Sequence, residues 1–317
     1  MKLFEHPDFT DILLAAADRF AMPVQFVQKD YFVTEALRLV AEEFGSAVVF
    51  KGGTSLSKGW RLVARFSEDV DLFVNPVAFD PPLESKNRIN KALKRLRDVV
   101  AKHPALIYLE AEGHTTGGLA REDHFRFESR FADLPGIRPT LMVEPGIRSG
   151  DAPTTSVGLQ SYASEFLERE GVVLEVDDLA SFEMRLLHFR RTFVEKLLAV
   201  HSKIMAVLED ASTIDREARH YADIHSLLQT PEVQRMLRSD EYAAIKADCD
   251  AVSRRFFANY RPPEDLDLSA SPALFPDGDL QERLRAAYDA QCALLFYGPY
   301  PSFDEVLAAL QRVRDYV

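Results

Sequence analysis

Two glycines between a β-branched segment and an alternating acidic segment constrain this chain most. The run 47–50 is rich in valine and ends at Lys51-Gly52-Gly53, and the run 69–74 alternates polar and apolar residues before Asn75-Pro76. Both runs are typical of strands, and the glycines and the proline mark where they stop. Residues 54–64 are long enough for a short helix. The order strand, glycine turn, helix, strand predicts an α/β layout.

The rest of the pattern divides the chain into a sheet-rich part and a helical part. Before residue 180 we expect helices at 8–20, 26–44 and 84–101 and further strands at 106–112, 125–131 and 140–144. After it we expect helices at 192–209, 214–228, 231–237, 240–259, 280–295 and 303–316. The sequence therefore predicts an α/β domain over residues 1–180 and a mainly α-helical C-terminal domain over residues 181–317.

Composition excludes several classes of protein. The 317 residues include 38 basic and 50 acidic ones, and a net charge of −12 disfavours nucleic-acid binding over the whole surface. No run approaches the ~18 apolar residues of a membrane span, and the first residues are too acidic for a signal peptide. We therefore expect a cytoplasmic protein with no membrane partner. Its two cysteines, Cys249 and Cys292, are too few for a disulfide framework.

Asp69 and Asp71 are the first candidate site residues. On a strand they point to one side, while Val70 and Leu72 point to the other. Two carboxylates this close repel each other unless a cation lies between them, and Mg²⁺ prefers a few carboxylates together with phosphate oxygens. The alternative is that one aspartate caps a turn and the other faces water.

The glycine turn is a candidate phosphate site, because backbone N–H groups are free where a strand leads into a helix. Residues 52–58 differ from a P-loop at one position, since Ser57 replaces the second glycine. We reject the P-loop because an acidic pair follows so soon after the turn. The candidate nucleotide-binding residues here are Gly52, Gly53, Thr54, Ser55, Lys58 and Arg65.

Over residues 25–230 the sequence resembles the AbiEii/AbiGii toxin group of the polymerase-β-like nucleotidyltransferases. The resemblance rests on four blocks, which are Gln28-Lys-Asp-Tyr31, Phe50–Lys58 with Arg65–Leu72, Arg191–Lys196, and Arg219–His225. It implies a nucleotidyltransferase sheet domain followed by a helical domain, and a magnesium-dependent enzyme. Thr54 stands where the family pattern has serine.

The resemblance implies that two metal ions, Mg²⁺ or Mn²⁺, are held by Asp69, Asp71 and a third carboxylate, with an NTP as substrate. Glu144 is the candidate for the third carboxylate because it ends the apolar run 140–144. The alternative for Glu144 is an ordinary glutamate at a strand end.

Lys196 and Asp223 complete the candidate catalytic set. Thr192 and Glu195 have the spacing of a capping box, which predicts that a helix begins at Thr192 with Lys196 in its first turn. The resemblance implies that Lys196 holds the triphosphate and that Asp223 lies in the same cleft between the domains. The alternatives are a solvated lysine and a surface ion pair between Arg219 and Asp223.

The basic segment 86–97 contains six basic residues and no acidic one. On a helix, Ile89, Leu93 and Leu96 would be buried and the basic side chains would be exposed. The candidate RNA-binding residues are Lys86, Arg88, Lys91, Lys94 and Arg95. The alternative is a solvated amphipathic helix.

The expected acceptor comes from the resemblance and not from the residues. It is the 3′ end of tRNA, which would receive NMP while pyrophosphate leaves, in a toxin–antitoxin or phage-defence system with a cognate antitoxin. The alternatives are nucleotidylation of a small molecule or a protein, and a non-catalytic module that binds nucleotide or antitoxin.

Overall fold

The computed structural model describes residues 1–67, 69–132, 134, 137–210, 213–214 and 216–317. They form two compact units. The sheet unit comprises residues 1–60, 66–147 and 154–187, and the helical unit comprises residues 61–65, 148–153 and 188–317. Residue 180, where we expected the first domain to end, lies just before the last strand of the sheet unit.

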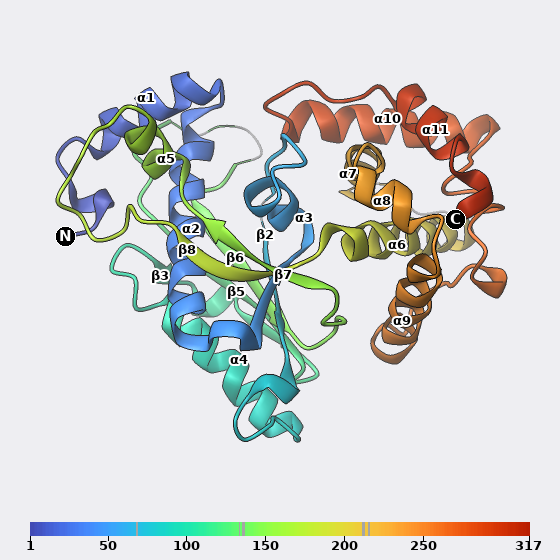
Figure 1. Ribbon diagram of the computed structural model, residues 1–317, viewed down its shortest axis with the longest axis horizontal. Helices are drawn as coiled ribbons and strands as arrows, with labels where there is room; N and C mark the ends of the chain where they lie inside the picture. The colour runs from blue at the N-terminus through green and yellow to red at the C-terminus, as the bar shows by residue number, and fades with distance from the viewer. Residues whose placement is uncertain (68, 133, 135–136, 211–212, 215) are drawn as a thin grey trace. The chain divides into compact units, whose positions relative to one another are not determined.

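A mixed sheet forms the sheet unit, with strand order β3-β5-β6-β2-β1-β8-β7 and β4 paired to β5 (Figure 1). β1 and β2 are antiparallel, whereas β2 runs parallel to β6 and β1 runs parallel to β8. The strands are β1 (Val48–Lys51), β2 (Asp69–Val74), β3 (Ile107–Tyr108), β4 (His114–Thr116), β5 (Ala120–Arg126), β6 (Thr140–Gly146), β7 (Thr154–Leu159) and β8 (Phe182–Leu187).

Both strands beside the glycine turn are confirmed, and the α/β layout with them. β3 is shorter than the expected strand 106–112 because a 3-10 turn follows it at Glu110–Glu112, and β5 begins at Ala120 rather than at residue 125. β4, β7 and β8 were not predicted. The apolar pattern of the sequence does not show β7 and β8, because polar side chains pair across these two strands. Ser156 Oγ donates to Glu183 at 2.7 Å, and Arg185 donates to Thr154 Oγ1 at 2.7 Å.

Helices α1 (Phe9–Phe20), α2 (Val24–Phe44), α4 (Lys86–Val100) and α5 (Tyr162–Arg169) complete the sheet unit. α2 contacts β1, β6 and β8, and α4 contacts α2, β5 and β6 (Figure 1). The expected buried stripe of α4 is confirmed, because Ile89, Leu93 and Leu96 are buried. Ser85 begins the helix by accepting the N–H of Arg88. The segment after Gly52 is shorter than the expected helix 54–64. α3 (Gly52–Thr54) continues as one wide turn that ends at Gly59.

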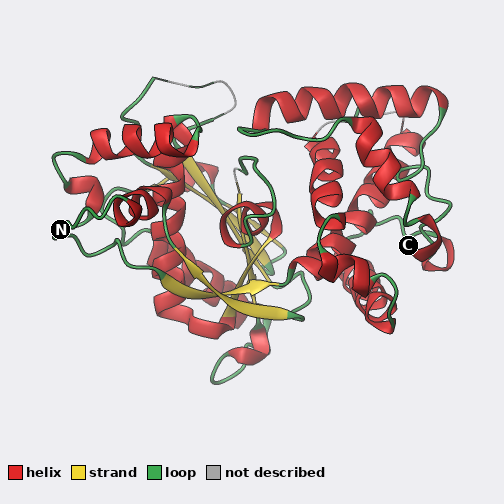
Figure 2. Ribbon diagram, turned by 45° about the horizontal axis from the view of Figure 1, so that its top comes forward, coloured by secondary structure: helices red, strands yellow, loops and turns green. Residues whose placement is uncertain are grey.

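The helical unit contains α6 (Phe189–Asp210), α7 (Arg219–Leu228), α8 (Pro231–Met236), α9 (Asp240–Phe256), α10 (Gly278–Leu295) and α11 (Phe303–Gln311). Figure 2 shows these helices joined by loops. α6 packs against α7, α8 and α9. The rings of Tyr221 and Tyr288 contact Phe303 with centroids 5.4 and 5.3 Å away. The mainly α-helical second part is therefore confirmed. Among the described residues, no helix is both long enough and apolar enough to span a bilayer.

Candidate functional site

Three carboxylates lie on one face of neighbouring strands. β2 pairs with β6 in parallel, so that Asp71 lies beside Glu144 and Asp69 beside Met142. Val70 and Leu72 are buried on the other face, as the alternation predicts. Farther along β2 the same face becomes apolar, and Phe73 packs there in a buried cluster with Val49 and Leu187. The fold thus gathers Asp69, Asp71 and Glu144 at one end of an otherwise apolar surface.

Glu144 has a raised pKa in this group of carboxylates. Burial raises its pKa to about 7, with further upward contributions from Asp71, Asp69 and Glu122. The sequence did not identify Lys51, which lies opposite Asp71 on β1 and places its Nζ 3.6 Å from Asp71 Oδ1. Lys51 lowers the pKa of Glu144 while the neighbouring carboxylates raise it, so a further cation at this face would stabilise the ionised carboxylates.

The donor chemistry fits a hard divalent cation, since carboxylate oxygens are the ligands that Mg²⁺ and Mn²⁺ prefer. The described side chains, however, are not arranged as a metal site. Within the described part of the chain, no three His, Cys, Asp or Glu side chains converge closely enough to hold one ion. Asp69, Asp71 and Glu144 thus supply the residue types and the shared face, while their oxygens lie apart.

The glycine turn packs directly against the acidic strand. Gly52 has φ +76°, and a Cβ on it would lie 2.0 Å from Asp71 Oδ2, so any larger residue would be strained and would displace this carboxylate. The Thr54 hydroxyl donates to the Asp69 carbonyl, and Ser55 Oγ donates to the Gly52 carbonyl at 2.8 Å. These hydroxyls fasten the turn to β2 and to itself.

Lys58 is held by a residue outside the predicted set. Its Nζ lies 2.6 Å from Asp30 Oδ1 and 3.1 Å from the Gln160 carbonyl. The other oxygen of Asp30 accepts the N–H of Tyr162, at the start of α5. Asp30 therefore joins α2, α5 and the turn. The block Gln28–Tyr31 contained this aspartate, but sequence alone gave it no partner.

A second polar group that the sequence did not identify lies on β5, the strand beside β6. His124 Nε2 is 2.9 Å from Glu122 Oε1, and His114 Nε2 is 3.3 Å from Glu122 Oε2. Glu122 contributes to the raised pKa of Glu144. The acidic face therefore extends past the three predicted carboxylates.

In the helical unit, Arg65, Lys196 and Asp223 form one buried ion cluster. Arg65 donates two hydrogen bonds to the Asp223 carboxylate, at 2.6 and 2.8 Å, and Lys196 Nζ lies 2.7 Å from Asp223 Oδ2. Asp223 is 0% exposed and Arg65 is 1% exposed. The surface ion pair and the solvated lysine are both excluded. His220 is an unpredicted member, with Nδ1 3.0 Å from Lys196 Nζ.

The protonation states in this cluster follow from burial and charge. Burial alone would raise the pKa of Asp223, but Arg65 and Lys196 together lower it well below its usual value, and Asp223 is ionised. Burial lowers the pKa of Lys196, opposed by Asp223. Burial, together with the charge of Lys196, lowers the pKa of His220 to about 3, so this imidazole is neutral.

The expected capping box is wrong. α6 begins at Phe189, so Thr192 lies inside the helix and Lys196 lies beyond the first turn. Glu195 instead accepts from Arg191 Nε at 3.1 Å, one helical turn before it. The helix starts early because the N–H of Arg191 already bonds the His188 carbonyl at 2.9 Å.

Glu144→Gln should make the metal-free protein more stable at pH 8. A carboxyl whose pKa rises on folding stabilises the protein while it is protonated, and that stabilisation is lost as the pH rises through about 7. We expect the variant to gain about 1 to 3 kcal/mol in free energy of unfolding at pH 8, and little at pH 4. Urea unfolding with EDTA at both pH values measures this. Exposed Glu175→Gln is the control, and a gain independent of pH would contradict the assignment.

Asp223→Ala should lower the free energy of unfolding by about 3 to 5 kcal/mol, because Arg65 and Lys196 would be left buried without their counter-ion. Guanidinium unfolding at pH 7 measures the loss. Asp304→Ala removes a carboxylate that is 69% exposed and pairs with Arg285, and should cost about 1 kcal/mol or less. Equal losses in free energy of unfolding for the two variants would show that the buried cluster stabilises the protein no more than an exposed ion pair does.

Comparison with known proteins identifies the family. The family model described as nucleotidyl transferase AbiEii toxin, type IV toxin–antitoxin system, matches residues 36–309. Among solved structures, MenT4, a nucleotidyltransferase toxin from Mycobacterium tuberculosis H37Rv, is similar over 96% of this chain and 94% of its own, with 18% identity and a TM-score of 0.37. None of the curated proteins matches. The family match spans both acidic strands and the buried cluster and confirms the resemblance: the chain belongs to the AbiEii nucleotidyltransferase toxins of type IV toxin–antitoxin systems.

Proposed function

We propose that this toxin transfers NMP from an NTP to the 3′ end of tRNA and releases pyrophosphate, with Mg²⁺ or Mn²⁺ as its cofactor. The observation that carries the transfer reaction is the face formed by Asp69, Asp71 and Glu144, with Gly52 packed against Asp71. Family membership supports a nucleotidyl donor and an antitoxin partner.

In the proposed reaction, the oxygen of the acceptor hydroxyl attacks the α-phosphorus of the NTP. A P–O bond forms, the bond to pyrophosphate breaks, and the hydroxyl proton moves to a carboxylate. Glu144 is the carboxylate proposed for this last role, because it lies beside Asp71 on the neighbouring strand. Asp69, Asp71 and Glu144 would hold the divalent cation, which when bound neutralises phosphate charge and activates the hydroxyl.

The other predicted residues take supporting roles in this proposal. Gly52 leaves room for Asp71, and the backbone N–H groups of the turn from Gly52 to Gly53 are the proposed phosphate contacts. The Thr54 and Ser55 hydroxyls and the Lys58–Asp30 pair hold the turn in place. In the helical unit, Asp223 is the counter-ion of Lys196 and is itself held by Arg65.

Helix α4 supports an RNA acceptor. Lys86, Lys91 and Lys94 are exposed, Arg88 is half-buried, and Arg95 is exposed although it pairs with Glu43. In a protein of net charge −12, this helix is a local basic surface of the kind that binds phosphates without reading bases. Nucleotides added to the 3′ end would block aminoacylation, which would arrest growth or abort a phage infection in the cytoplasm.

Asp71→Asn should abolish transfer. We expect labelled RNA when wild-type protein is incubated with total tRNA, Mg²⁺ and each α-³²P-labelled NTP in turn. The variant should reduce the label about 100-fold or more, because it removes one charge from the metal-binding face. EDTA should have the same effect. Exposed Asp18→Asn, a matched change on α1, should retain the label. Label that persists in Asp71→Asn, or that appears on protein instead of RNA, would contradict the proposal.

Reversing the charge of Lys91, Lys94 and Arg95 to Glu should raise the KM for tRNA about tenfold or more and leave the KM for NTP unchanged, because phosphate contacts contribute to affinity for RNA and not to the chemical step. Lys203→Glu with Arg235→Glu and Arg255→Glu makes the same change in net charge at exposed sites of the helical unit. An equal effect of both triple variants would show that net charge, and not the position of α4, determines the affinity for tRNA.

A further inference from the structure

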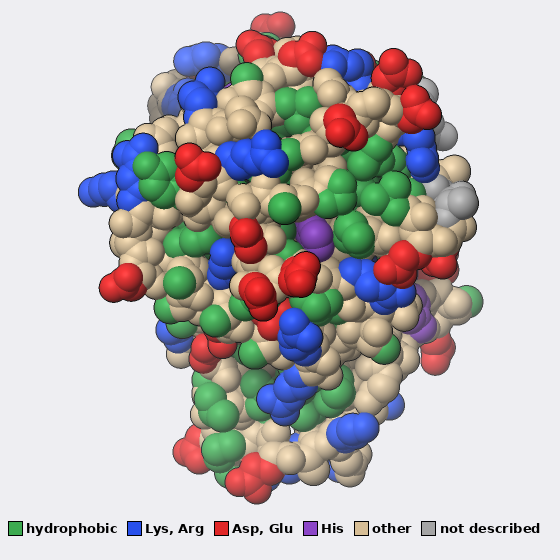
Figure 3. Space-filling view, turned by 90° about the vertical axis from the view of Figure 1, so that its right-hand side faces the viewer, with side chains coloured by type: hydrophobic (Ala, Val, Ile, Leu, Met, Phe, Trp, Pro, Cys, Tyr) green, Lys and Arg blue, Asp and Glu red, His purple; other side chains and the backbone are tan. Residues whose placement is uncertain are grey.

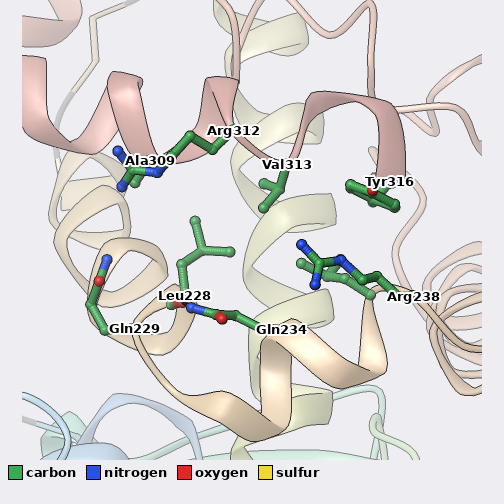
Figure 4. A pocket seen from close by; sticks show the side chains of 9 residues that line it. Leu228, Gln229, Gln234, Arg238, Ala309, Arg312, Val313 and Tyr316 are labelled. Carbon is green, nitrogen blue, oxygen red and sulfur yellow. Dashed lines mark hydrogen bonds between the residues drawn. The ribbon is translucent and has the colours of Figure 1, made fainter.

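A recess of about 200 Å³ in the helical unit has no assigned role. It lies where α7, α8 and α11 end, and in Figure 4 the side chains of Arg238 and Arg312 lie to either side of Leu228 and Val313. Gln229, Gln234 and Tyr316 complete the polar lining. The recess therefore combines an apolar floor with guanidinium, amide and phenol groups at its rim.

The charge in the recess is all of one sign. Acidic and basic side chains are intermixed over the face seen in Figure 3, but both charged residues that line the recess are arginines. Within the part of the chain that the structure describes, neither Arg238 nor Arg312 forms an ion pair. Arg238 instead lies over the ring of Tyr316, 5.3 Å from its centroid, and Tyr316 is 43% exposed.

The two glutamines add hydrogen-bond acceptors to the lining. Gln234 Nε2 donates to the Leu228 carbonyl at 2.9 Å, and Gln229 Nε2 donates to the His225 carbonyl at 3.4 Å. Each bond restrains the amide, and within the described residues both side-chain oxygens are left without a donor. Both glutamines are exposed, so their side-chain oxygens are accessible to the N–H groups of a ligand.

A bare anion would use only part of this lining. A small anion would meet the arginines but would use neither the glutamine oxygens nor the Tyr316 ring. A nucleotide uses all three kinds of group, since it has a phosphate, ring N–H or amino groups and a flat face that stacks on aromatic and guanidinium groups.

We propose that this recess binds an unpaired nucleotide of the RNA acceptor. Its phosphate meets Arg312 or Arg238, its base stacks on Tyr316, and its N–H groups donate to Gln229 and Gln234. An acidic peptide would satisfy the arginines but has no flat base to stack on the part of the Tyr316 ring that Arg238 leaves exposed. The inference rests on the proposed RNA acceptor and adds a second RNA contact, distinct from α4.

The test measures RNA binding apart from catalysis. In the Asp71→Asn background, fluorescence anisotropy gives the Kd of labelled, unmodified tRNA. Arg238→Ala with Arg312→Ala should raise this Kd about tenfold, and Tyr316→Ala should raise it about fivefold or more. The matched control, Arg235→Ala with Arg255→Ala, removes the same charge from exposed sites outside the recess and should change the Kd less than about twofold. The substituted side chains in all three variants are exposed, and thermal unfolding checks that each variant folds.

The outcomes separate this inference from the proposed function. If the Kd is unchanged in the recess variants while wild-type protein still labels tRNA, the recess proposal is overturned and the transfer reaction stands. If the recess variants weaken tRNA binding while wild-type protein labels no RNA, the recess is supported and the tRNA-transfer reaction is overturned. If the recess variants lose binding of a hexaglutamate probe but keep that of tRNA, the recess binds acidic protein segments and the RNA assignment is wrong.

Discussion

Repulsion between carboxylates is the constraint on which the site depends. The parallel pairing of β2 with β6 sets Asp71 beside Glu144, and the apolar residues of the same strands, Val70 and Val143, are buried on the other face. Burial of those residues outweighs the repulsion, because apolar surface removed from water stabilises the whole sheet. The fold therefore keeps these carboxylates close together although their mutual repulsion is unfavourable. Lys51 relieves only part of that charge.

The helical unit handles charge in the opposite way. Asp223 is completely buried, yet two cations and hydrogen bonds satisfy it, and its carboxylate has no need of solvent. Such a cluster specifies which segments must come together more than it adds net stability. Glycine turn and acidic strand are joined just as specifically, since the Thr54 hydroxyl bonds the Asp69 backbone and Gly52 leaves room for Asp71.

Local pattern predicted much of this, and tertiary pairing accounts for the rest. Alternation placed Asp69 and Asp71 on one face and located β2, whereas the β-branched run before the two glycines located β1. β7 and β8 escaped prediction because their cross-strand partners are polar, and the start of α6 was misplaced because a backbone bond to His188 begins the helix before Thr192. Burial of Lys196 beside Asp223, and the capture of Lys58 by Asp30, join residues far apart in sequence, which no local spacing encodes.

Chain connectivity gives the buried cluster a further consequence. Residues 61–65 belong to the helical unit although they interrupt the sheet unit, and they include Arg65, which makes the two-bond contact with Asp223. A fragment that began at residue 188 would contain Asp223 and Lys196 but would lack that guanidinium. Its core would then hold a carboxylate with half of its compensation missing. Proteolysis between the units would therefore not release an independent helical module, and evolution could not exchange that module by a single crossover in the gene.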